Sequence, residues 1–221
     1  MQLALVSTDG TDFRWLETGG PAAMASYLPP DGASVLFVGG MVDTPAGQSI
    51  ARIDLATGSI QTLVEAQPFG DMVGAPRSDP SGDRFVYSLW LRNAADGEAR
   101  HFTMPTDGTE APLMVPPPAG ICCEGLPAWS NDGTKLALNR QYYEHGVIAI
   151  IDAIEGGTGA EFVLEGEVAS LAFSPDDRYV LVTRTGEVKE HIVLDAATAQ
   201  PVEDPRANDG ASSWQRVGSG T

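Results

Sequence analysis

The side chains with the most distinctive chemistry in this chain are two cysteines and three histidines. Cys122 and Cys123 are adjacent, which matches no zinc-ligand spacing, so they form either two free thiols or a strained vicinal disulfide. His101 and His191 each begin a separate strand-like run, and His145 lies in a polar stretch. A shared metal ion would require all three histidines to converge. We therefore interpret them as isolated residues and expect no metal and no other cofactor.

The short motifs that carry nucleophilic, phosphate or dinucleotide chemistry are absent from the sequence. There is no Gly-x-Ser-x-Gly elbow, no Walker A loop, no dinucleotide fingerprint and no calcium-binding loop. Asp-Gly pairs begin, among other places, at positions 9, 31, 107 and 132. They indicate turns, because Asp accepts backbone hydrogen bonds and Gly adopts positive φ. The sequence therefore predicts a protein that is not an enzyme, with no catalytic residue.

The net charge of the chain limits the classes of partner that we expect it to bind. The 221 residues include 30 acidic and 13 basic side chains, which gives a formal net charge of −17. This field repels phosphate backbones, so we expect no nucleic-acid partner. The acidic surface either keeps the protein soluble or attracts a basic partner. No apolar run reaches the roughly 18 residues that a membrane-spanning helix needs.

Turn residues recur along the chain at an interval of about 43 to 51 positions. One series of turns ends at positions 32, 82, 133 and 177, and a second ends at 10, 58, 108, 156 and 199. Runs rich in Val, Leu, Phe and Tyr flank the turns, as is typical of buried strands. Each repeat therefore reads as four strands joined by two tight turns and two looser loops.

Repetition of four-stranded units is the signature of a β-propeller, whereas a sandwich does not repeat its turns at one period. We predict an all-β, single-domain propeller over residues 1–221. Its four complete blades lie at about 21–65, 70–116, 122–166 and 167–203. Residues 2–18 supply the last two strands of a further blade and residues 211–217 its first strand. The ring then has five blades, one of them short and split between the termini, or the chain is an incomplete arc of a larger ring.

In a propeller, the loops between the second and third strands of each blade share one face. That face is predicted to bind a protein or peptide partner through Trp90, Arg92, Arg140, Tyr142, Tyr143 and His145, because aromatic residues and Arg dominate interface energetics. Alternatively, Tyr142 and Tyr143 only cover blade edges. A competing hypothesis is a lyase or glycosidase that acts from a central channel through Arg77, Asp79 and Arg140.

Several segments resemble the TolB-type, WD40-like propeller repeats known as PD40 repeats. They are Val6-Ser-Thr-Asp-Gly-Thr, Trp129-Ser-Asn-Asp-Gly-Thr-Lys-Leu-Ala and Phe173-Ser-Pro-Asp-Asp-Arg-Tyr-Val. The likeness is weak at 75–85, where Ser78 takes the aromatic position. The family's usual ring has six blades, more than this chain supplies.

The resemblance implies a bacterial, extracytoplasmic protein that binds other proteins, and it carries over no catalytic residue. We expect a monomer. No signal peptide is visible after Met1, so a cytoplasmic location or a fragment of a larger propeller protein stays an alternative.

Overall fold

The computed structural model describes residues 2–7, 9–27, 32–41, 47–65, 72–90, 99–142, 145–185 and 190–203. All regular elements of these residues are β-strands, as expected for an all-β chain. The chain divides into two compact units, Met1–Met114 and Val115–Thr221. Each unit is described separately below, and the single-domain organisation stays a prediction.

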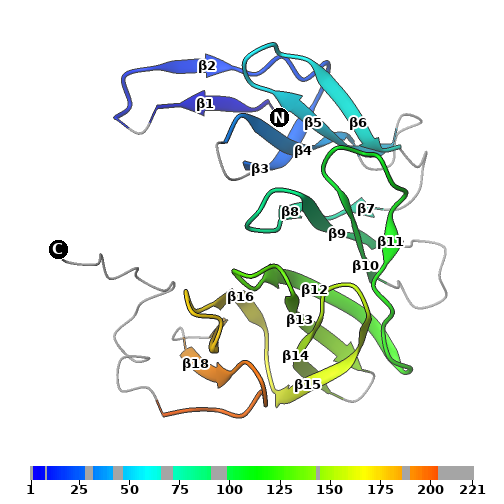
Figure 1. The fold of residues 1–221 in the computed structure, drawn as a ribbon, viewed down its shortest axis with the longest axis vertical. Helices are drawn as coiled ribbons and strands as arrows, with labels where there is room; N and C mark the ends of the chain where they lie inside the picture. Colours follow the sequence, from blue (N-terminus) through cyan, green and yellow to red (C-terminus); the bar gives the residue numbers. More distant parts are fainter. Residues whose placement is uncertain are drawn as a thin grey trace. The chain divides into compact units, whose positions relative to one another are not determined.

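The first unit begins with a two-stranded antiparallel sheet and a four-stranded antiparallel sheet (Figure 1). The two-stranded sheet consists of β1 (Ala4–Val6) and β2 (Phe13–Trp15). The second sheet, here called blade 1, consists of β3 (Ala22–Tyr27), β4 (Ser34–Gly40), β5 (Gln48–Asp54) and β6 (Ile60–Val64). Its strands pair in chain order, so each turn joins neighbouring strands.

The third sheet of the first unit, blade 2, has an interrupted first strand. Its strands are β7 (Met72–Val73), β8 (Arg77–Ser78), β9 (Arg84–Trp90), β10 (Ala99–Pro105) and β11 (Leu113–Met114). Both β7 and β8 pair with β9, so together they take the place of one strand. Pro76 lies in the break between them, and proline has no N–H to donate to a ladder.

Blade 1 buries both of its faces, as a propeller blade must. One face of blade 1 packs against blade 2, through Leu36, Val38, Ile50, Val73, Phe85, Tyr87 and Met104. The opposite face packs against the β1–β2 sheet, through Ala22, Val35, Phe37, Ala51 and Ile53 with Leu3 and Leu16. Neighbouring positions on β4 therefore point to opposite cores, which is the period-2 alternation of a strand buried on both sides.

The second unit contains two sheets (Figure 1). Blade 3 has four strands in chain order, β12 (Ile121–Trp129), β13 (Lys135–Tyr142), β14 (Gly146–Asp152) and β15 (Gly156–Leu164). Blade 4 has three, β16 (Val168–Phe173), β17 (Tyr179–Arg184) and β18 (Glu190–Asp195). An isolated bridge between Leu194 and Pro201 follows β18. Within the described residues, blade 4 thus lacks the complete fourth strand that we expected.

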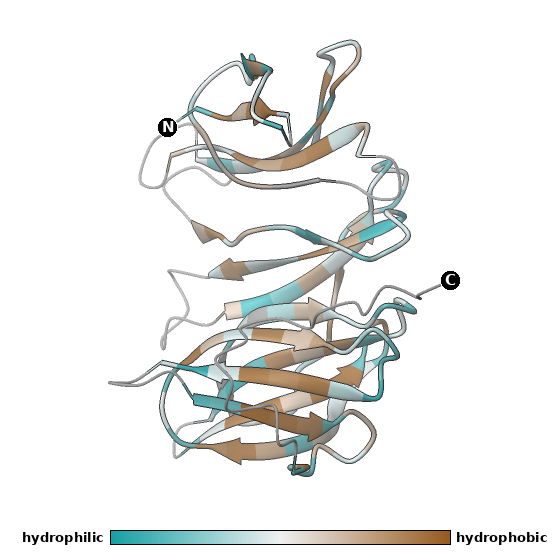
Figure 2. Ribbon diagram, turned by 90° about the vertical axis from the view of Figure 1, so that its left-hand side faces the viewer, coloured by the Kyte–Doolittle hydropathy of each residue, from teal (hydrophilic) through white to brown (hydrophobic). Residues whose placement is uncertain are grey.

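Blades 3 and 4 share one core. The buried residues that form it are Ala137, Ile148, Ile150, Leu164, Phe173, Val180, Val182, Leu194, Ala196 and Ala199. Figure 2 shows the central strands largely in the brown of hydrophobic residues and the turns between them in the teal of hydrophilic ones. Burial of this many aliphatic side chains stabilises the stacked sheets, at about 1.5–3 kcal/mol for each large one.

In blades 2, 3 and 4, the turn between the first two strands is built from a serine and an aspartate two residues apart. In blade 3, Ser130 Oγ donates to Asp132 Oδ1 at 2.7 Å and accepts from Lys135 N at 2.9 Å. In blade 4, Ser174 Oγ likewise donates to Asp176 at 2.6 Å and accepts from Tyr179 N at 3.0 Å. Each of these bonds joins residues no more than five positions apart in the chain.

Blade 2 closes the same turn with the two residue types exchanged. Ser81 Oγ donates to Asp79 Oδ2 at 2.8 Å, and Asp79 Oδ1 accepts from Arg84 N at 3.2 Å. The backbone bonds match as well: Asp79 N donates to Arg84 O at 2.9 Å, as Ser130 N does to Lys135 O at 3.0 Å. The segment that resembles the repeat least therefore keeps its turn.

The turn of blade 4 also holds the turn of blade 3. Asp177 has a left-handed backbone, with φ of 57°, where blade 3 has Gly133 at 72°. The Asp177 carboxylate accepts from Asn131 N at 2.6 Å, from Asn131 Nδ2 at 2.7 Å and from Asp132 N at 2.9 Å. Asp177 thus adopts a left-handed backbone conformation that favours glycine. Its carboxylate forms three hydrogen bonds between the two blades.

The expected fifth blade is described only in part. Its predicted last two strands, within residues 2–18, are β1 and β2. Residues 211–217, predicted to supply its first strand, lie outside the described residues. No helix in the described part of the chain has the length and hydropathy needed to cross a bilayer.

Candidate functional site

A buried charged cluster lies in blade 3, at the end of β13 that leads to β14. Arg140 and Glu124 face each other across β12 and β13, and both side chains are 0% exposed. Arg140 Nε donates to Glu124 Oε1 at 2.8 Å, and Nη1 donates to the carbonyl of Thr158 at 2.9 Å. Glu161 on β15 approaches Arg140 Nη1 at 3.5 Å. One guanidinium thereby links three strands of one sheet.

Tyr142 extends this cluster to the surface. Its hydroxyl donates to Glu161 Oε1 at 2.9 Å, the same oxygen that lies near Arg140. Desolvation and this hydrogen bond raise the pKa of the Tyr142 phenol above its ordinary value. The phenol therefore stays protonated and serves as a hydrogen-bond donor, which fixes the direction of the ring.

His145 stacks on Tyr142 at the end of the same hairpin. The two ring centroids are 5.1 Å apart with an interplanar angle of 19°. Tyr142 N donates to the His145 carbonyl at 2.9 Å, which closes the loop between β13 and β14. Because Tyr142 is half-buried and His145 is exposed, the stack presents an ordered aromatic edge to solvent.

The structure places the six residues that were predicted to bind a partner in different environments. Tyr142 and His145 lie together at the end of one hairpin. Arg140 is the exception: its side chain is fully buried by the ion pair with Glu124, so it cannot reach a partner from the surface. Trp90 ends β9 in the first unit, is 37% exposed and pairs across the ladder with Met72. Arg92 and Tyr143 lie outside the described residues.

The residues proposed for a catalytic channel are engaged elsewhere or exposed. Asp79 is buried and holds the turn of blade 2, while Arg77 is exposed on β8. Arg140 is tied to Glu124 inside blade 3. Within the described ranges, no three His, Cys, Asp or Glu side chains are grouped so as to hold a metal ion. The side chains of Cys122 and Cys123 are not among those described.

The other two histidines pair with hydroxyls on the neighbouring strand. His101 is buried, with Nδ1 3.1 Å from Ser88 Oγ, and His191 has Nδ1 3.2 Å from Thr183 Oγ1. In each case the hydroxyl lies on the second strand of a blade and the histidine directly opposite on the third. Both pairs are cross-strand contacts within one blade, and His101 is buried rather than at the surface.

Sequence reasoning missed Glu124 and Glu161, the two acids that organise the cluster. Glu124 lies opposite Arg140 only because β12 bulges between Gly125 and Ala128, which shifts the register by one residue. Counting back from the turn without this bulge pairs Arg140 with Gly125 instead. One signal in the sequence could have indicated this pair. The two mostly apolar strands that flank the predicted turn each contain a charged residue, Glu124 in the first and Arg140 in the second.

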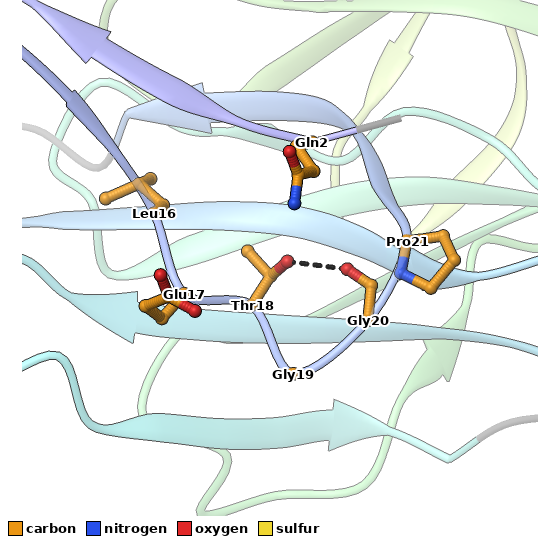
Figure 3. Close-up of a pocket in the computed structure, with 7 residues that line it drawn as sticks. All are labelled: Gln2, Leu16, Glu17, Thr18, Gly19, Gly20 and Pro21. Carbon is orange, nitrogen blue, oxygen red and sulfur yellow. Dashed lines mark hydrogen bonds between the residues drawn. The ribbon is translucent and has the colours of Figure 1, made fainter.

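A pocket of about 370 Å³ lies in the first unit, where β2 leads into β3 (Figure 3). Gln2, Leu16, Glu17, Thr18, Gly19, Gly20 and Pro21 line it. Thr18 Oγ1 donates to the Gly20 carbonyl at 2.8 Å, which orders the connecting loop. No residue of this pocket, here called the Thr18 pocket, was predicted from the sequence.

Comparison with solved structures shows the fold. TolB from Acinetobacter baumannii superposes with a TM-score of 0.64 at 21% identity over 90% of this chain, and a putative TolB from Agrobacterium tumefaciens with 0.62 at 16% over 92%. An oligogalacturonate lyase in complex with manganese gives 0.56 at 15% over 78%. This chain covers 48%, 69% and 50% of those three chains, so it spans about half the length of the first.

Comparisons of sequence alone do not assign the chain to a protein family. No protein-family model matches it, and no curated protein matches it. At these identities the structural likeness concerns the backbone and not the activity. The repeated small antiparallel sheets, which stack face to face within each unit, and the superpositions lead to one conclusion: the chain has a TolB-like β-propeller fold.

Proposed function

We propose that this protein binds another protein or a peptide through the Tyr142–His145 edge of blade 3, without catalysing a reaction. The observation that carries the proposal is the fixed geometry of the stack. Tyr142 is held by Glu161, which lies next to the buried Arg140. Ordered aromatic groups bind well because little conformational entropy remains to be lost.

The finer assignments are part of the same proposal. The PD40-type turns at Ser130–Thr134 and Ser174–Arg178 support membership of the TolB-type repeat family, and with it a bacterial, extracytoplasmic, monomeric protein. The net charge of −17 supports a protein partner over a nucleic acid. Non-enzymatic action is supported because Asp79 and Arg140, two of the three channel candidates, already serve the turn of blade 2 and the core of blade 3.

The test compares two substitutions in quantitative affinity capture from a native bacterial extract, followed by affinity measurement with the purified retained protein. Tyr142→Ala removes the aromatic edge. Val163→Ala serves as the control. It shortens an apolar side chain on β15 of the same unit that is 59% exposed.

We expect Tyr142→Ala to weaken binding of the retained protein at least tenfold, because truncation of a central interface aromatic typically costs about 2 kcal/mol or more. Val163→Ala should leave the affinity unchanged. Tyr142→Phe separates the hydroxyl from the ring and should lie between the two. Equal affinities for Tyr142→Ala and the control would move the binding surface away from blade 3.

A further inference from the structure

Two carboxylates share one guanidinium in the cluster next to the Tyr142–His145 edge. Arg140 Nε donates to Glu124 at 2.8 Å, whereas Nη1 lies 3.5 Å from Glu161. Glu124 is 0% exposed and Glu161 is 23% exposed. One basic and two acidic side chains give the cluster a formal net charge of −1. The excess negative charge lies on Glu161, at the end of the cluster that reaches solvent.

Only one carboxylate oxygen of Glu161 is engaged. The Tyr142 hydroxyl donates to Oε1 at 2.9 Å, and Arg140 Nη1 approaches the same atom. Among the described residues, no hydrogen bond or ion pair reaches Oε2 of Glu161. Because an ionised carboxylate can accept about four hydrogen bonds, Glu161 retains the capacity to bind a further donor.

Within the described part of the second unit, no other basic side chain supplies the missing positive charge. Lys135 and Arg178 belong to the turns between the first two strands of their blades, and Arg184 pairs with Glu190 at 2.8 Å. The connection between β13 and β14 adds one acid, Glu144, and no lysine or arginine. A charge that is partly removed from water without a counter-ion is unfavourable, so the cluster attracts a cation.

The aromatic stack and a further carboxylate adjoin this charge. Glu165 directly follows Leu164, which pairs with Gly146, the neighbour of His145. Both Glu165 and His145 are exposed. Aromatic rings and carboxylates each attract cations, and the two attractions together select an ammonium or a guanidinium group.

We propose that the partner contacts this edge through a lysine or arginine side chain, whose charged group binds Oε2 of Glu161 and whose apolar stem lies along the rings of Tyr142 and His145. The inference rests on the proposed function and adds the chemistry of the partner residue. A long basic side chain suits the edge because its stem packs on apolar surface while its head remains polar. Glu165 strengthens the attraction of a basic segment to the same place.

The first experiment titrates the full chain with the peptide acetyl-Ser-Arg-Ser-Arg-Ser-amide and follows binding by NMR. A copy with citrulline in place of arginine keeps the length of the side chain and removes its charge. The ring signals of Tyr142 and His145 report binding at the edge itself, which separates it from weak attraction to the acidic surface elsewhere.

Three variants test the carboxylates. Glu161→Gln keeps an oxygen that accepts from the Tyr142 hydroxyl and removes the charge. Glu165→Gln removes the neighbouring exposed charge. Glu155→Gln is the matched control, because Glu155 is exposed in the turn at the other end of β14 and β15.

We expect the arginine peptide to shift both ring signals and Glu161→Gln to weaken binding about tenfold, because hydrogen bonds to charged groups contribute more than neutral ones. The citrulline peptide should bind about tenfold more weakly for the same reason. Glu165→Gln should have a smaller effect, and Glu155→Gln should bind as the wild type does.

The second experiment repeats the affinity measurement with the protein retained in the capture assay. Weaker binding by both Tyr142→Ala and Glu161→Gln supports the basic contact. Weaker binding by Tyr142→Ala alone refutes the basic contact and leaves the proposed function in place. Unchanged binding by both variants refutes the proposed function and, with it, this inference.

Three further results would overturn the proposal. The first is an arginine peptide that leaves the ring signals of Tyr142 and His145 unchanged. The second is equal binding of the citrulline peptide, because charge would then play no part. The third is a shift of these signals in the free protein when Arg92, Lys189, Arg206 and Arg216, which lie outside the described residues, are replaced by serine. The cation would then come from this chain and not from a partner.

Discussion

Blades 3 and 4 place an arginine at the same point of the repeat and use it in opposite ways. Arg140 and Arg184 each lie five residues after the start of the second strand. Across the first strand, Arg140 meets Glu124, whereas Arg184 meets Val168. Arg140 therefore forms a buried ion pair inside the sheet, and Arg184 turns to Glu190 on the third strand, at 2.8 Å and in contact with solvent.

The difference teaches that burial of the arginine depends on its neighbour and not on its position in the fold. Removing two charges from water costs several kcal/mol for each ion before any attraction is counted. Glu124 and the Thr158 carbonyl offset that cost in blade 3. Blade 4 has Val168 where blade 3 has Glu124, so no acid lies opposite Arg184 across the first strand. The Arg184 side chain therefore remains 28% exposed.

The largest effect should come from breaking the buried pair. Arg140→Ala leaves Glu124 buried without its cation, and loss of one partner of such a pair typically costs about 3–5 kcal/mol. We expect this loss in the free energy of unfolding, measured by urea titration and followed by tryptophan fluorescence.

A double substitution sharpens this prediction. Arg140→Met with Glu124→Leu removes both charges and keeps apolar volume, so most of the lost stability should return. If the double variant is as unstable as Arg140→Ala, packing and not charge burial explains the loss. In that case the contrast between the two arginines would not be electrostatic.

The next effect concerns the turn bonds between the two blades. Asp177→Ala removes all three hydrogen bonds to Asn131 and Asp132 and keeps a side chain at positive φ. We expect a loss of about 1–3 kcal/mol in urea unfolding, the typical cost of unsatisfied donors. Asp177→Gly removes the same bonds but relieves the backbone, so it should be less harmful. Equal losses for both would show that backbone strain is negligible there.

Acid should weaken both blades through their turn carboxylates. The hydrogen bond from a serine hydroxyl is the main cause that lowers the pKa of Asp132 and of Asp176 below the ordinary 3.8. A similar bond from Ser7, in the turn between β1 and β2, lowers the pKa of Asp9 to about 2. Groups with a lowered pKa in the folded state stabilise it above their unfolded pKa, and this stability is lost as the pH falls through the folded value.

The melting temperature should therefore fall between about pH 4 and pH 2, where these carboxylates become protonated. Asp132→Asn combined with Asp176→Asn should melt lower at neutral pH but decline less on acidification. Differential scanning fluorimetry across this range checks the prediction. Parallel curves for wild type and variant would assign the acid sensitivity to other groups.

The smallest effect belongs to the exposed pair. Arg184→Ala should change the unfolding free energy by about 0–1 kcal/mol, because solvent and salt screen a surface ion pair. Added salt should shrink this difference further. A loss close to that of Arg140→Ala would remove the distinction between the blades.

The sheets could be predicted because their turns are encoded locally. Ser130, Asp132 and Thr134 bond to one another within five residues, so the strands on either side follow from the sequence. The position of Tyr142 and His145 in one short hairpin could be predicted for the same reason, whereas their stacking was not predicted. Burial of Arg140 could not, because it depends on a bulge in β12 and on Glu161 in β15, which only tertiary pairing brings into register.

The exchanged serine and aspartate of blade 2 have a consequence for how such repeats diverge. Asp79 and Ser81 keep the backbone of their turn because the two positions need one donor and one acceptor, in either order. A profile that scores each column separately penalises this compensated exchange twice. Propeller repeats can thus diverge in sequence by paired swaps while the backbone of the turn is kept.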